Sequence, residues 1–334
     1  MTPVGLLHQM WELHDADEQA FYDRAVVEAQ AADRHGFASM WIGEHHYRQD
    51  RPFYGRVPSP ELLIANLVAH TERIRFGTGV KVVPLADPAR TAEQMSMLFL
   101  LAGGRVEFGL GQGTGYAPVT IEDRGRKSSQ FRDSMARLLD LLALGPCTDE
   151  GHVISPTPMP ELIERLWVAS RDDAAVMFAA EHDLGFVVGQ AEHEALQAQY
   201  VERYRAAGGR GEVRGVRVVH VAATEAEAKQ RAAECASLYW STMQNGPYHR
   251  LAVEQGLFPA GQPDNLDDLL HRSLFIAGDP DQVSEQLRRY RMTTGVDRVD
   301  VMMQLPLLDR GAVDDAMALF MSDVAPQLDA AVAA

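Results

Sequence analysis

The chain has 334 residues, of which 46% are hydrophobic and 23% are charged, a composition typical of a globular protein with a large core. Its formal charge of −16 would repel a phosphate backbone over most of the surface, which argues against nucleic acid as a partner. The longest apolar runs are far shorter than the roughly 20 residues that span a bilayer, and the first residues lack a positively charged leader. We therefore expect a cytoplasmic protein with no membrane partner.

The residues that could bind a metal ion are scattered along the sequence. Cys147 and Cys235 lie far apart and belong to no paired-cysteine motif, so neither a disulfide framework nor a zinc site is expected. His45 and His46 are adjacent in an extended segment, where neighbouring side chains point in opposite directions and cannot easily share one ion. The sequence therefore predicts no metal site.

Apolar, β-branched stretches alternate with helical patterns along the chain, as in parallel strands joined by crossover helices. Eight segments have the character of strands: Val4–Gln9, Ser39–Ile42, Ile74–Val83, Val106–Leu110, Leu166–Ala169, Leu184–Val188, Val216–Ala222 and Arg298–Met303. Eight strand–helix units predict an α/β fold of the TIM-type (β/α)8 barrel class, formed by a single domain over residues 1–334.

Local signals mark where several helices begin and end. Ser59-Pro60, Asp87-Pro88 and Asp279-Pro280 each place a capping residue before a proline, which suits the first helical position because proline has no N–H. Gly36 and Gly295 follow helical patterns, and glycine can adopt the left-handed conformation that ends a helix.

Two stretches interrupt the alternation of strands and helices. Gly145–Glu164 is rich in proline, and Tyr239–Arg272 contains several glycine and proline turns after the seventh strand. Long insertions between barrel elements are commonly lids or binding loops, so the second stretch is a candidate lid. The alternative is a surface excursion without function, because long loops are tolerated at little cost in stability.

Polar or glycine-rich segments follow three of the predicted strands, at the end of a barrel where active sites are built. Glu44–Tyr47 follows the second strand, Gly109–Gly115 covers the end of the fourth, and Ser170–Asp173 follows the fifth and opens a helix. A histidine of the first segment can act as a base near neutral pH, although a lone histidine pair is more often structural. The glycines would allow a ligand to approach the backbone, although such a series also suits a flexible loop.

The glycine series is not a dinucleotide-binding fingerprint. Thr114 stands where the third glycine of that motif should be, and no helix follows at once. In the third segment, Ser170 and Arg171 at a helix start could bind phosphate. Asp172 and Asp173 could equally be ordinary acidic residues of a first helical turn.

At these residues the sequence resembles the bacterial luciferase-like, flavin-dependent monooxygenase family. The matching blocks are Ala31–His46, Pro58–Pro60, Thr71–Gly79, Pro84–Gln94 and Gly103–Gly109, followed more loosely by Leu166–Ser170, Gly278–Pro280 and Gly295–Asp297. The resemblance implies a (β/α) barrel that holds reduced flavin mononucleotide (FMN) at its C-terminal mouth and uses O2 to oxygenate an organic substrate. A separate flavin reductase would supply the reduced FMN, because the chain has no nicotinamide fingerprint of its own.

The resemblance also implies roles for individual residues. His45 matches the catalytic histidine of the family, so we expect it to act in proton transfer and His46 to be mainly structural. Gly79-Val80 matches a cis peptide bond behind the flavin ring of several members. The segments with Gln112 and Gly113 and with Ser170 and Arg171 match parts that contact the flavin and its phosphate.

One position departs from the family pattern. Where many members carry Gly-Arg-Gly, with an arginine that pairs with the phosphate, this chain has Gly111-Gln112-Gly113. A neutral amide replaces a bidentate cation, and Asp172 and Asp173 would oppose an anion nearby. The sequence therefore predicts that Arg171, the nearest cation in the motif, neutralises the flavin phosphate.

Several large side chains fall near the expected mouth of the barrel. Trp11, Tyr47 and Tyr116, together with Met302 and Met303, suggest a fairly apolar substrate site, because aromatic rings offer flat contact area and methionine fills irregular space. The methionines may equally be barrel core.

Two other functions are compatible with the sequence. One is a deazaflavin-dependent oxidoreductase that transfers hydride, a chemistry found among relatives with the same barrel. The other is a non-catalytic flavin-binding subunit that stabilises a catalytic paralogue, which Gln112 and the acidic turn after the fifth strand would suit.

Assembly into a homodimer, or a heterodimer with a paralogue, is also expected. The resemblance implies contact through the helices near Pro60–Thr71 and Pro88–Leu101, and both are more apolar than one core-facing stripe requires. The apolar residues that suggested a second buried face are Ile64, Leu67, Val68, Met95, Leu98 and Phe99.

Overall fold

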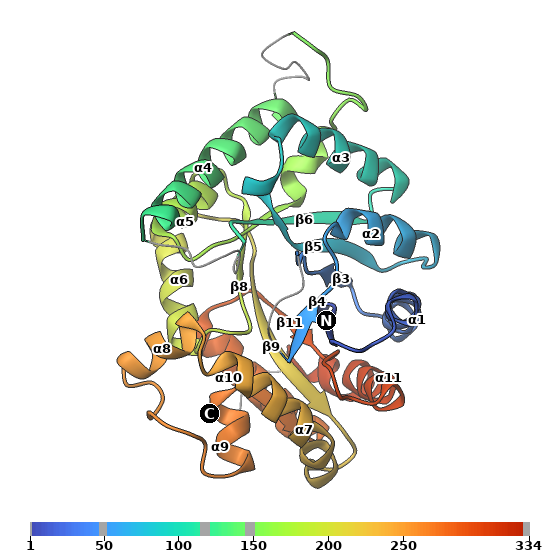
Figure 1. Cartoon of the computed structure of the whole chain (residues 1–334), viewed down its shortest axis with the longest axis vertical. Helices are drawn as coiled ribbons and strands as arrows, with labels where there is room; N and C mark the ends of the chain where they lie inside the picture. Colours follow the sequence, from blue (N-terminus) through green and yellow to red (C-terminus); the bar gives the residue numbers. More distant parts are fainter. Residues whose placement is uncertain (1, 47–51, 114–120, 144–150, 330–334) are drawn as a thin grey trace.

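The computed structural model describes residues 2–46, 52–113, 121–143 and 151–329, with side chains from residue 128 onward in the third range. Eight parallel strands close into a barrel (Figure 1). They are β1 (Gly5–His8), β3 (Ser39–Ile42), β5 (Arg75–Val82), β6 (Val106–Gly111), β7 (Leu166–Ala169), β8 (Gly185–Val188), β9 (Val213–Val221) and β11 (Arg298–Met302). The ring closes because β9 pairs with both β8 and β11. The predicted (β/α)8 fold class is confirmed, and the strand with the largest shift, β9, begins at Val213 rather than Val216.

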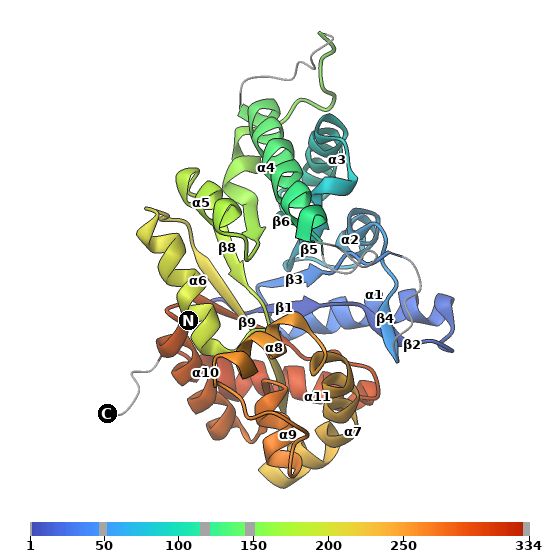
Figure 2. The ribbon, with the colours of Figure 1, turned by 60° about the vertical axis from the view of Figure 1, so that its left-hand side comes forward.

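Helices connect the strands around the outside of the barrel. They are α1 (Glu18–His35), α2 (Pro60–Ala69), α3 (Pro88–Leu101), α4 (Ile121–Ala143), α5 (Asp173–Glu181), α6 (Glu194–Ala206), α7 (Glu225–Met243), α8 (Pro247–Glu254), α9 (Leu266–Arg272), α10 (Pro280–Thr294) and α11 (Arg310–Leu319). Figure 2 shows α3 and α4 side by side outside β5 and β6, with α7 and α9 together at the opposite end near β9. No helix in the described ranges is long and apolar enough to cross a membrane.

The predicted helix ends are confirmed by the backbone geometry. The carboxylates of Asp87 and Asp279 accept from the backbone N–H groups of the first helical turn, and Asp279 completes a capping box. Ser59 instead donates its hydroxyl to Glu61, at 3.1 Å. Gly36 and Gly295 end their helices with φ of 90° and 70°, which is the left-handed region that favours glycine.

Three short strands were not predicted from the sequence. β10 (Phe275–Gly278) pairs with the last four residues of β9, beginning at Val218, where the pairing of β9 with β11 ends. β2 (Trp11–Leu13) and β4 (Phe53–Gly55) form an antiparallel pair above the ends of β1 and β3. β2 and β4 are only three residues long and carry no periodic signal of their own, so their pairing in the tertiary structure defines them.

The two insertions differ from simple loops. The stretch Tyr239–Arg272 holds the end of α7 and the short helices α8 and α9, so it is mostly helical. In Gly145–Glu164, the described part runs into a short 3-10 helix, η2 (Pro160–Arg165), which leads directly into β7. The role of Tyr239–Arg272 as a lid stays a prediction.

The interior of the barrel is closed at the N-terminal ends of its strands by a buried arginine between two tryptophans. The guanidinium carbon of Arg214 lies 4.0 Å from the ring centroid of Trp41 and 4.8 Å from that of Trp167. The two indole rings meet edge to face, with centroids 5.9 Å apart. Arg214 is only 1% exposed, and the stacking replaces part of the hydration that its charge loses.

Carboxylates and a serine complete this plug. Arg214 forms an ion pair with Asp300, which also accepts from the backbone N–H of Gly5 at 2.8 Å. The hydroxyl oxygen of Ser39 accepts from Arg214 at 3.1 Å. Glu107 accepts from the indole of Trp167 at 2.8 Å. A Cβ at Gly5 would lie 2.5 Å from oxygen atoms of Asp300 and Ser39, so the packing leaves room for glycine alone.

We expect Arg214→Met to lower the free energy of unfolding by about 3–5 kcal/mol, because it removes the nearer cation from the buried Asp300 and leaves only Arg298, whose Nε lies 3.7 Å away. Urea unfolding followed by circular dichroism would measure the change. Arg203→Met is a matched control: Arg203 pairs with Asp173 at the surface, where the side chains are 49% and 73% exposed, so its loss should cost under about 1 kcal/mol. Equal losses in the two variants would contradict a structural role for the plug.

Candidate active site at the barrel mouth

His45 lies directly after β3, at the C-terminal mouth of the barrel. Its Nε2 is 2.9 Å from the side-chain oxygen of Gln9, which follows β1. Two glycines make room for the pair: a Cβ at Gly43 would lie 2.5 Å from that oxygen, and one at Gly55 would lie 2.0 Å from Cδ2 of His45. The backbone N–H of His45 donates to Val57 at 2.8 Å, so the ring has a fixed position.

His46 is held away from this pair by Glu44. Its Nε2 is 2.8 Å from one oxygen of Glu44, and the other oxygen accepts from the backbone N–H of Val82 at 3.1 Å. Burial raises the pKa of the Glu44 carboxyl above its usual range, and the hydrogen bond from His46 opposes that rise. His46 thus has a contact that holds the backbone of β5 through Glu44, whereas the catalytic role of His45 stays a prediction.

Aromatic side chains line one side of the mouth. Trp11 on β2 pairs with Gly55 on the antiparallel strand β4, and the ring of His45 lies against Gly55. The ring of Trp11 is 5.0 Å from that of Phe53 and 5.9 Å from that of Tyr239 on α7. The structure therefore brings the predicted substrate residue Trp11 close to His45, where it packs on a buried aromatic cluster that includes Tyr239 of the insertion.

The Gly79–Val80 peptide bond is cis, as the family resemblance implies. It lies in β5, where the pairing with β6 shifts register between Thr78 and Lys81. A Cβ at Gly109 would lie 2.3 Å from the carbonyl oxygen of Thr78, and one at Gly111 would lie 2.6 Å from a methyl carbon of Val80. These two glycines therefore accommodate the irregular part of β5, which is a structural reason for glycine that the sequence did not reveal.

Gln112 and Ser170 meet at the ends of neighbouring strands. The amide nitrogen of Gln112 is 3.4 Å from the hydroxyl oxygen of Ser170, and that oxygen accepts from the backbone N–H of Asp172 at 3.2 Å. Gly113 follows with φ of 73°. Asp172 caps α5 by accepting from the N–H of Ala175. Its carboxylate therefore has the structural role that the alternative interpretation gave it.

Arg171 turns toward another acid, Glu192. Its Nε and one terminal nitrogen lie 2.8 and 3.0 Å from the two oxygens of Glu192, and its other terminal nitrogen donates to the carbonyls of Ser170 and Val187, both at 2.9 Å. The charge that suggested a phosphate-binding role is thus already matched within the protein. The role of Arg171 at a flavin phosphate stays a prediction.

Some predicted residues fall outside the described residues. These are Tyr47 and Tyr116, both expected at the substrate, as well as Thr114, Gly115 and Cys147. Cys235 lies buried on α7, and burial raises the pKa of its thiol. Across the described parts of the chain, histidines, cysteines and acids form no group that could hold a metal ion.

Sequence reasoning missed Gln9, Tyr239 and a third residue, His220. His220 lies near the end of β9, is fully buried, and neither ring nitrogen has a hydrogen-bond partner among the described residues. Burial lowers the pKa of His220 to about 4, with a smaller contribution in the same direction from the charge of Arg231 on α7. A histidine within an apolar strand gave no signal, because its surroundings depend on α7 packing against β9 and β10.

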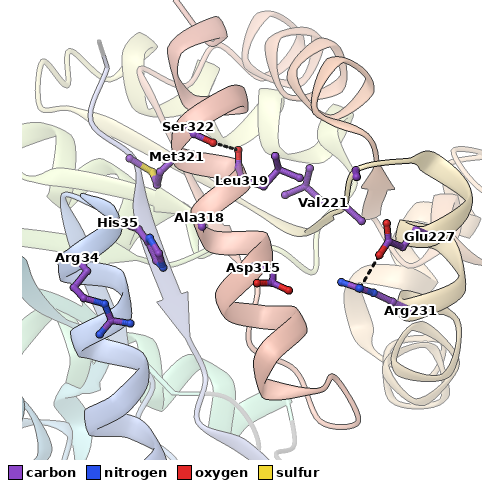
Figure 3. Close-up of a pocket in the computed structure, with 12 residues that line it drawn as sticks. Arg34, His35, Val221, Glu227, Arg231, Asp315, Ala318, Leu319, Met321 and Ser322 are labelled. Carbon is purple, nitrogen blue, oxygen red and sulfur yellow. Dashed lines mark hydrogen bonds and ion pairs between the residues drawn. The ribbon is translucent and has the colours of Figure 1, made fainter.

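A separate hollow of about 760 Å³ lies outside the mouth (Figure 3). Side chains from α1, α11, the end of β9 and the start of α7 surround it, among them His35, Asp315, Val221 and Arg231. None of the residues predicted for catalysis or cofactor binding lines it. The hollow is therefore not part of the candidate active site.

The buried His220 should make stability depend on pH. Its pKa is about 4 in the folded chain against an ordinary 6.5, so the unfolded chain takes up a proton first as the pH falls. As the pH falls from 6.5 to 4, the free energy of unfolding of the wild type should decrease by about 2–3 kcal/mol more than that of His220→Leu. Urea unfolding at each pH would measure the difference. The exposed His70 offers a control, and His70→Leu should follow the wild type. Parallel curves for His220→Leu and the wild type would contradict the assignment.

Comparison with known proteins places these observations in a family. A family model described as luciferase-like monooxygenase matches residues 6–298. The oxygenase component of the flavin-dependent trigonelline monooxygenase of Acinetobacter baylyi is 27% identical over 177 residues, which are 49% of this chain and 48% of that protein. The alkanal monooxygenase alpha chain of the Kryptophanaron alfredi symbiont is 26% identical over 52% of this chain and 50% of its own length.

An uncharacterized protein of Bacillus subtilis, YwcH, is 26% identical over 61% of this chain and 63% of its own length. The matches thus span less than two thirds of these curated relatives. The oxygenating constituent of 3,6-diketocamphane monooxygenase from Pseudomonas putida, solved with FMN, shares the fold with a TM-score of 0.78 at 20% identity, over 98% of both chains. An F420-dependent secondary alcohol dehydrogenase also shares the fold, with a TM-score of 0.69 at 16% identity, over 98% of this chain and 99% of its own.

Proposed function

The chain belongs to the luciferase-like monooxygenase family, and from this premise we propose that it is the oxygenase of a two-component system. As a single barrel domain over residues 1–334, it would use reduced FMN from a separate flavin reductase, together with O2, to oxygenate a small, fairly apolar organic substrate. The observation that carries the proposal is the placement of His45 and Trp11 against the same residue, Gly55, at the mouth of the barrel. A base beside an apolar surface suits proton transfer to or from such a substrate.

The residues at the mouth fit a flavin. The irregular segment around Gly79 and Val80 lies closely against the glycines of β6, which leaves a wall with few side chains for a planar ring system. Gln112, Gly113 and Ser170 would hold the polar tail, since an amide, a hydroxyl and the backbone at the start of α5 offer neutral donors to a phosphate. Bound reduced flavin would supply the two electrons with which one atom of O2 enters the substrate and the other leaves as water.

In this proposal, His45 moves the proton. Gln9 accepts from Nε2 of His45 through an amide oxygen, which only accepts, so Nε2 carries the proton of the neutral ring. Gln9 fixes that tautomer and the orientation of the ring. His45 is thus the proposed catalytic residue, and Gln9 is a positioning residue.

FMN is favoured over a deazaflavin as the cofactor. The trigonelline relative is named a flavin-dependent oxygenase component, which also supports a separate reductase. O2 uptake with photoreduced FMN should accompany product formation from apolar ketones or aldehydes. Turnover of a reduced deazaflavin without O2 uptake would instead identify the hydride-transfer alternative. Flavin binding with neither activity would identify a non-catalytic subunit.

We expect His45→Ala to lower product yield by about 10²-fold or more while FMN binding and the fold are retained, because the loss is one of proton transfer. Product yield would be measured by chromatography and FMN binding by fluorescence quenching. His46→Gln is the control, since it keeps a hydrogen-bonding side chain beside Glu44 and should retain most of the yield. An unchanged yield in His45→Ala would remove the catalytic role.

Assembly as a homodimer, or a heterodimer with a paralogue, is part of the proposal. The six residues that suggested a second apolar face belong to the core instead: five are buried, and Phe99 packs against them. A different set of large apolar side chains is exposed on this side of the barrel, on α2, the 3-10 helix η1 (Val83–Leu85) and α3: Leu62, Leu85, Met97, Leu100 and Leu101. Five such side chains on adjacent elements form the kind of surface that a subunit contact covers.

The double variant Met97→Glu and Leu101→Glu should shift the protein from dimer to monomer, because two carboxylates on α3 would have to be desolvated in the contact. Light scattering at micromolar concentration would give the mass. Met292 is another exposed methionine, on α10, so Met292→Glu serves as a control and should leave the mass unchanged. A wild type with the mass of one chain would contradict the dimer.

A further inference from the structure

His8, the last residue of β1, is a buried histidine with a partner at each ring nitrogen. It is 2% exposed. Its Nε2 lies 2.6 Å from a carboxylate oxygen of Glu28 on α1, and its Nδ1 accepts from the backbone N–H of Met10 at 3.1 Å. A backbone N–H only donates, so Nδ1 carries no proton. The ring is therefore held as the neutral tautomer with its proton on Nε2, facing Glu28.

The bond from Met10 to His8 closes the turn between β1 and β2. Met10 has φ of 52°, in the left-handed region that residues other than glycine seldom adopt. Asparagine and aspartate stabilise turns by accepting from the N–H two residues further on, and here the imidazole of His8 supplies that acceptor. His8 thus helps to hold a backbone conformation that is unfavourable for Met10.

The turn carries side chains of the candidate active site. Gln9, inside the turn, brings its side-chain oxygen to Nε2 of His45, and Trp11 follows directly at the start of β2. The backbone of the turn lies close to Gly43: a Cβ there would be 3.3 Å from Cα of Gln9, and the N–H of Gly43 donates to the carbonyl of His8 at 3.1 Å. The same Cβ would lie 3.0 Å from Nε2 of His45. A shift of the turn would therefore move Gln9 relative to His45.

Two further charged side chains fix the position of Glu28. Its other oxygen lies 3.6 Å from Nε of Arg24, one turn earlier on α1, and Arg24 also forms an ion pair with Glu12 on β2. These three side chains are 11% to 18% exposed, so the pairs are shielded from most of the solvent. A continuous series of contacts thus runs from α1 through His8 to the turn that carries Gln9.

A histidine is not needed at this position to fill the core. The side chains before it on β1, Leu6 and Leu7, are apolar and buried. An apolar side chain at position 8 would occupy the same buried place without removing an imidazole and a carboxylate from water, which costs free energy. An apolar side chain could not, however, accept from the N–H of Met10. The polar group is therefore explained by the turn that it holds.

We propose that His8 and Glu28 are positioning residues for the candidate catalytic His45. They hold the turn, and through it they keep Gln9 where it fixes one tautomer and one orientation of the ring. This inference deepens the proposed function, and it rests on that function only where product yield is measured.

The first test follows the imidazole of His45 by nitrogen-15 NMR in the flavin-free full chain, at a pH where the ring is neutral. The signals are assigned by their loss in His45→Gln. One nitrogen of a fixed tautomer carries the proton and the other does not, so their signals are widely separated, and exchange between tautomers brings them together. His8→Leu should narrow the separation as Gln9→Leu does. His8→Asn keeps an oxygen that can accept from Met10 and should keep the wild-type separation.

His35→Leu is the matched control for this measurement. His35 also lies close to a carboxylate, with Nε2 2.9 Å from an oxygen of Asp314, but it lines the hollow outside the mouth. Its replacement should leave the signals of His45 unchanged.

The second test measures turnover with reduced FMN and O2. His8→Leu should lower product yield by about 10-fold or more while FMN binds as before, because a misplaced base transfers protons poorly. His8→Asn should restore most of the yield. This arm depends on the proposed function, whereas the NMR arm does not. If His8→Leu narrows the separation but His45→Ala leaves the yield unchanged, the proposed function is wrong and the positioning role stands.

The proposal is overturned if His8→Leu lowers the melting temperature but leaves the signals of His45 as in the wild type, because the role of His8 is then purely structural. It is also overturned if Gln9→Leu leaves them unchanged, because Gln9 then does not set the tautomer. Should His8→Leu fail to fold, Glu28→Ala decides. That variant removes the acceptor of Nε2 and lets the ring of His8 turn away from Met10, so unchanged signals of His45 exclude the role.

Discussion

The position of Arg214 between Trp41 and Trp167 is the constraint on which the barrel depends. Its partners Ser39 and Asp300, together with Glu107, come from three other strands, so one buried charge ties β3, β6, β9 and β11 together at the closed end. A polar plug of this kind is stable only when nearly every charge has a partner, and this requirement fixes the registers of the strands. With the closed end fixed, the opposite ends of the same strands can carry irregular backbone and functional side chains.

At the mouth, glycines leave the space in which neighbouring side chains and backbone segments come into contact. Gly43 and Gly55 leave space for Gln9 and the ring of His45, whereas Gly109 and Gly111 accept the irregular segment of β5. A Cβ at any of these positions would approach another atom more closely than real contacts allow. The shape of the candidate active site thus depends on these glycines as much as on His45 and Trp11.

Charge compensation distinguishes two arginines that look alike in the sequence. Arg171 follows a strand and opens a helix, so it has the pattern of a phosphate ligand, yet Glu192 matches its charge. Arg217 lies within an apolar strand, where sequence alone suggests an ordinary outward-facing residue, yet it is the one without an acid. The difference arises because Glu192, in the loop before α6, reaches one of them with its carboxylate and the other only with its carbonyl.

The sequence by itself determined the barrel, its eight strands, the helix ends and the location of His45, Gln112 and Ser170 at one end, because hydrophobic periodicity, capping residues and glycine turns are local properties of the chain. Only the tertiary structure decided that His45 pairs with Gln9 and that Arg171 pairs with Glu192. It also decided that one terminal nitrogen of Arg217, the hydroxyl of Tyr239 and the ring nitrogens of His220 are buried without hydrogen-bond partners among the described residues. These outcomes depend on residues far apart in the chain. The strands β2 and β4 belong to the same class, since a segment of three residues becomes a strand only through the neighbour with which it pairs.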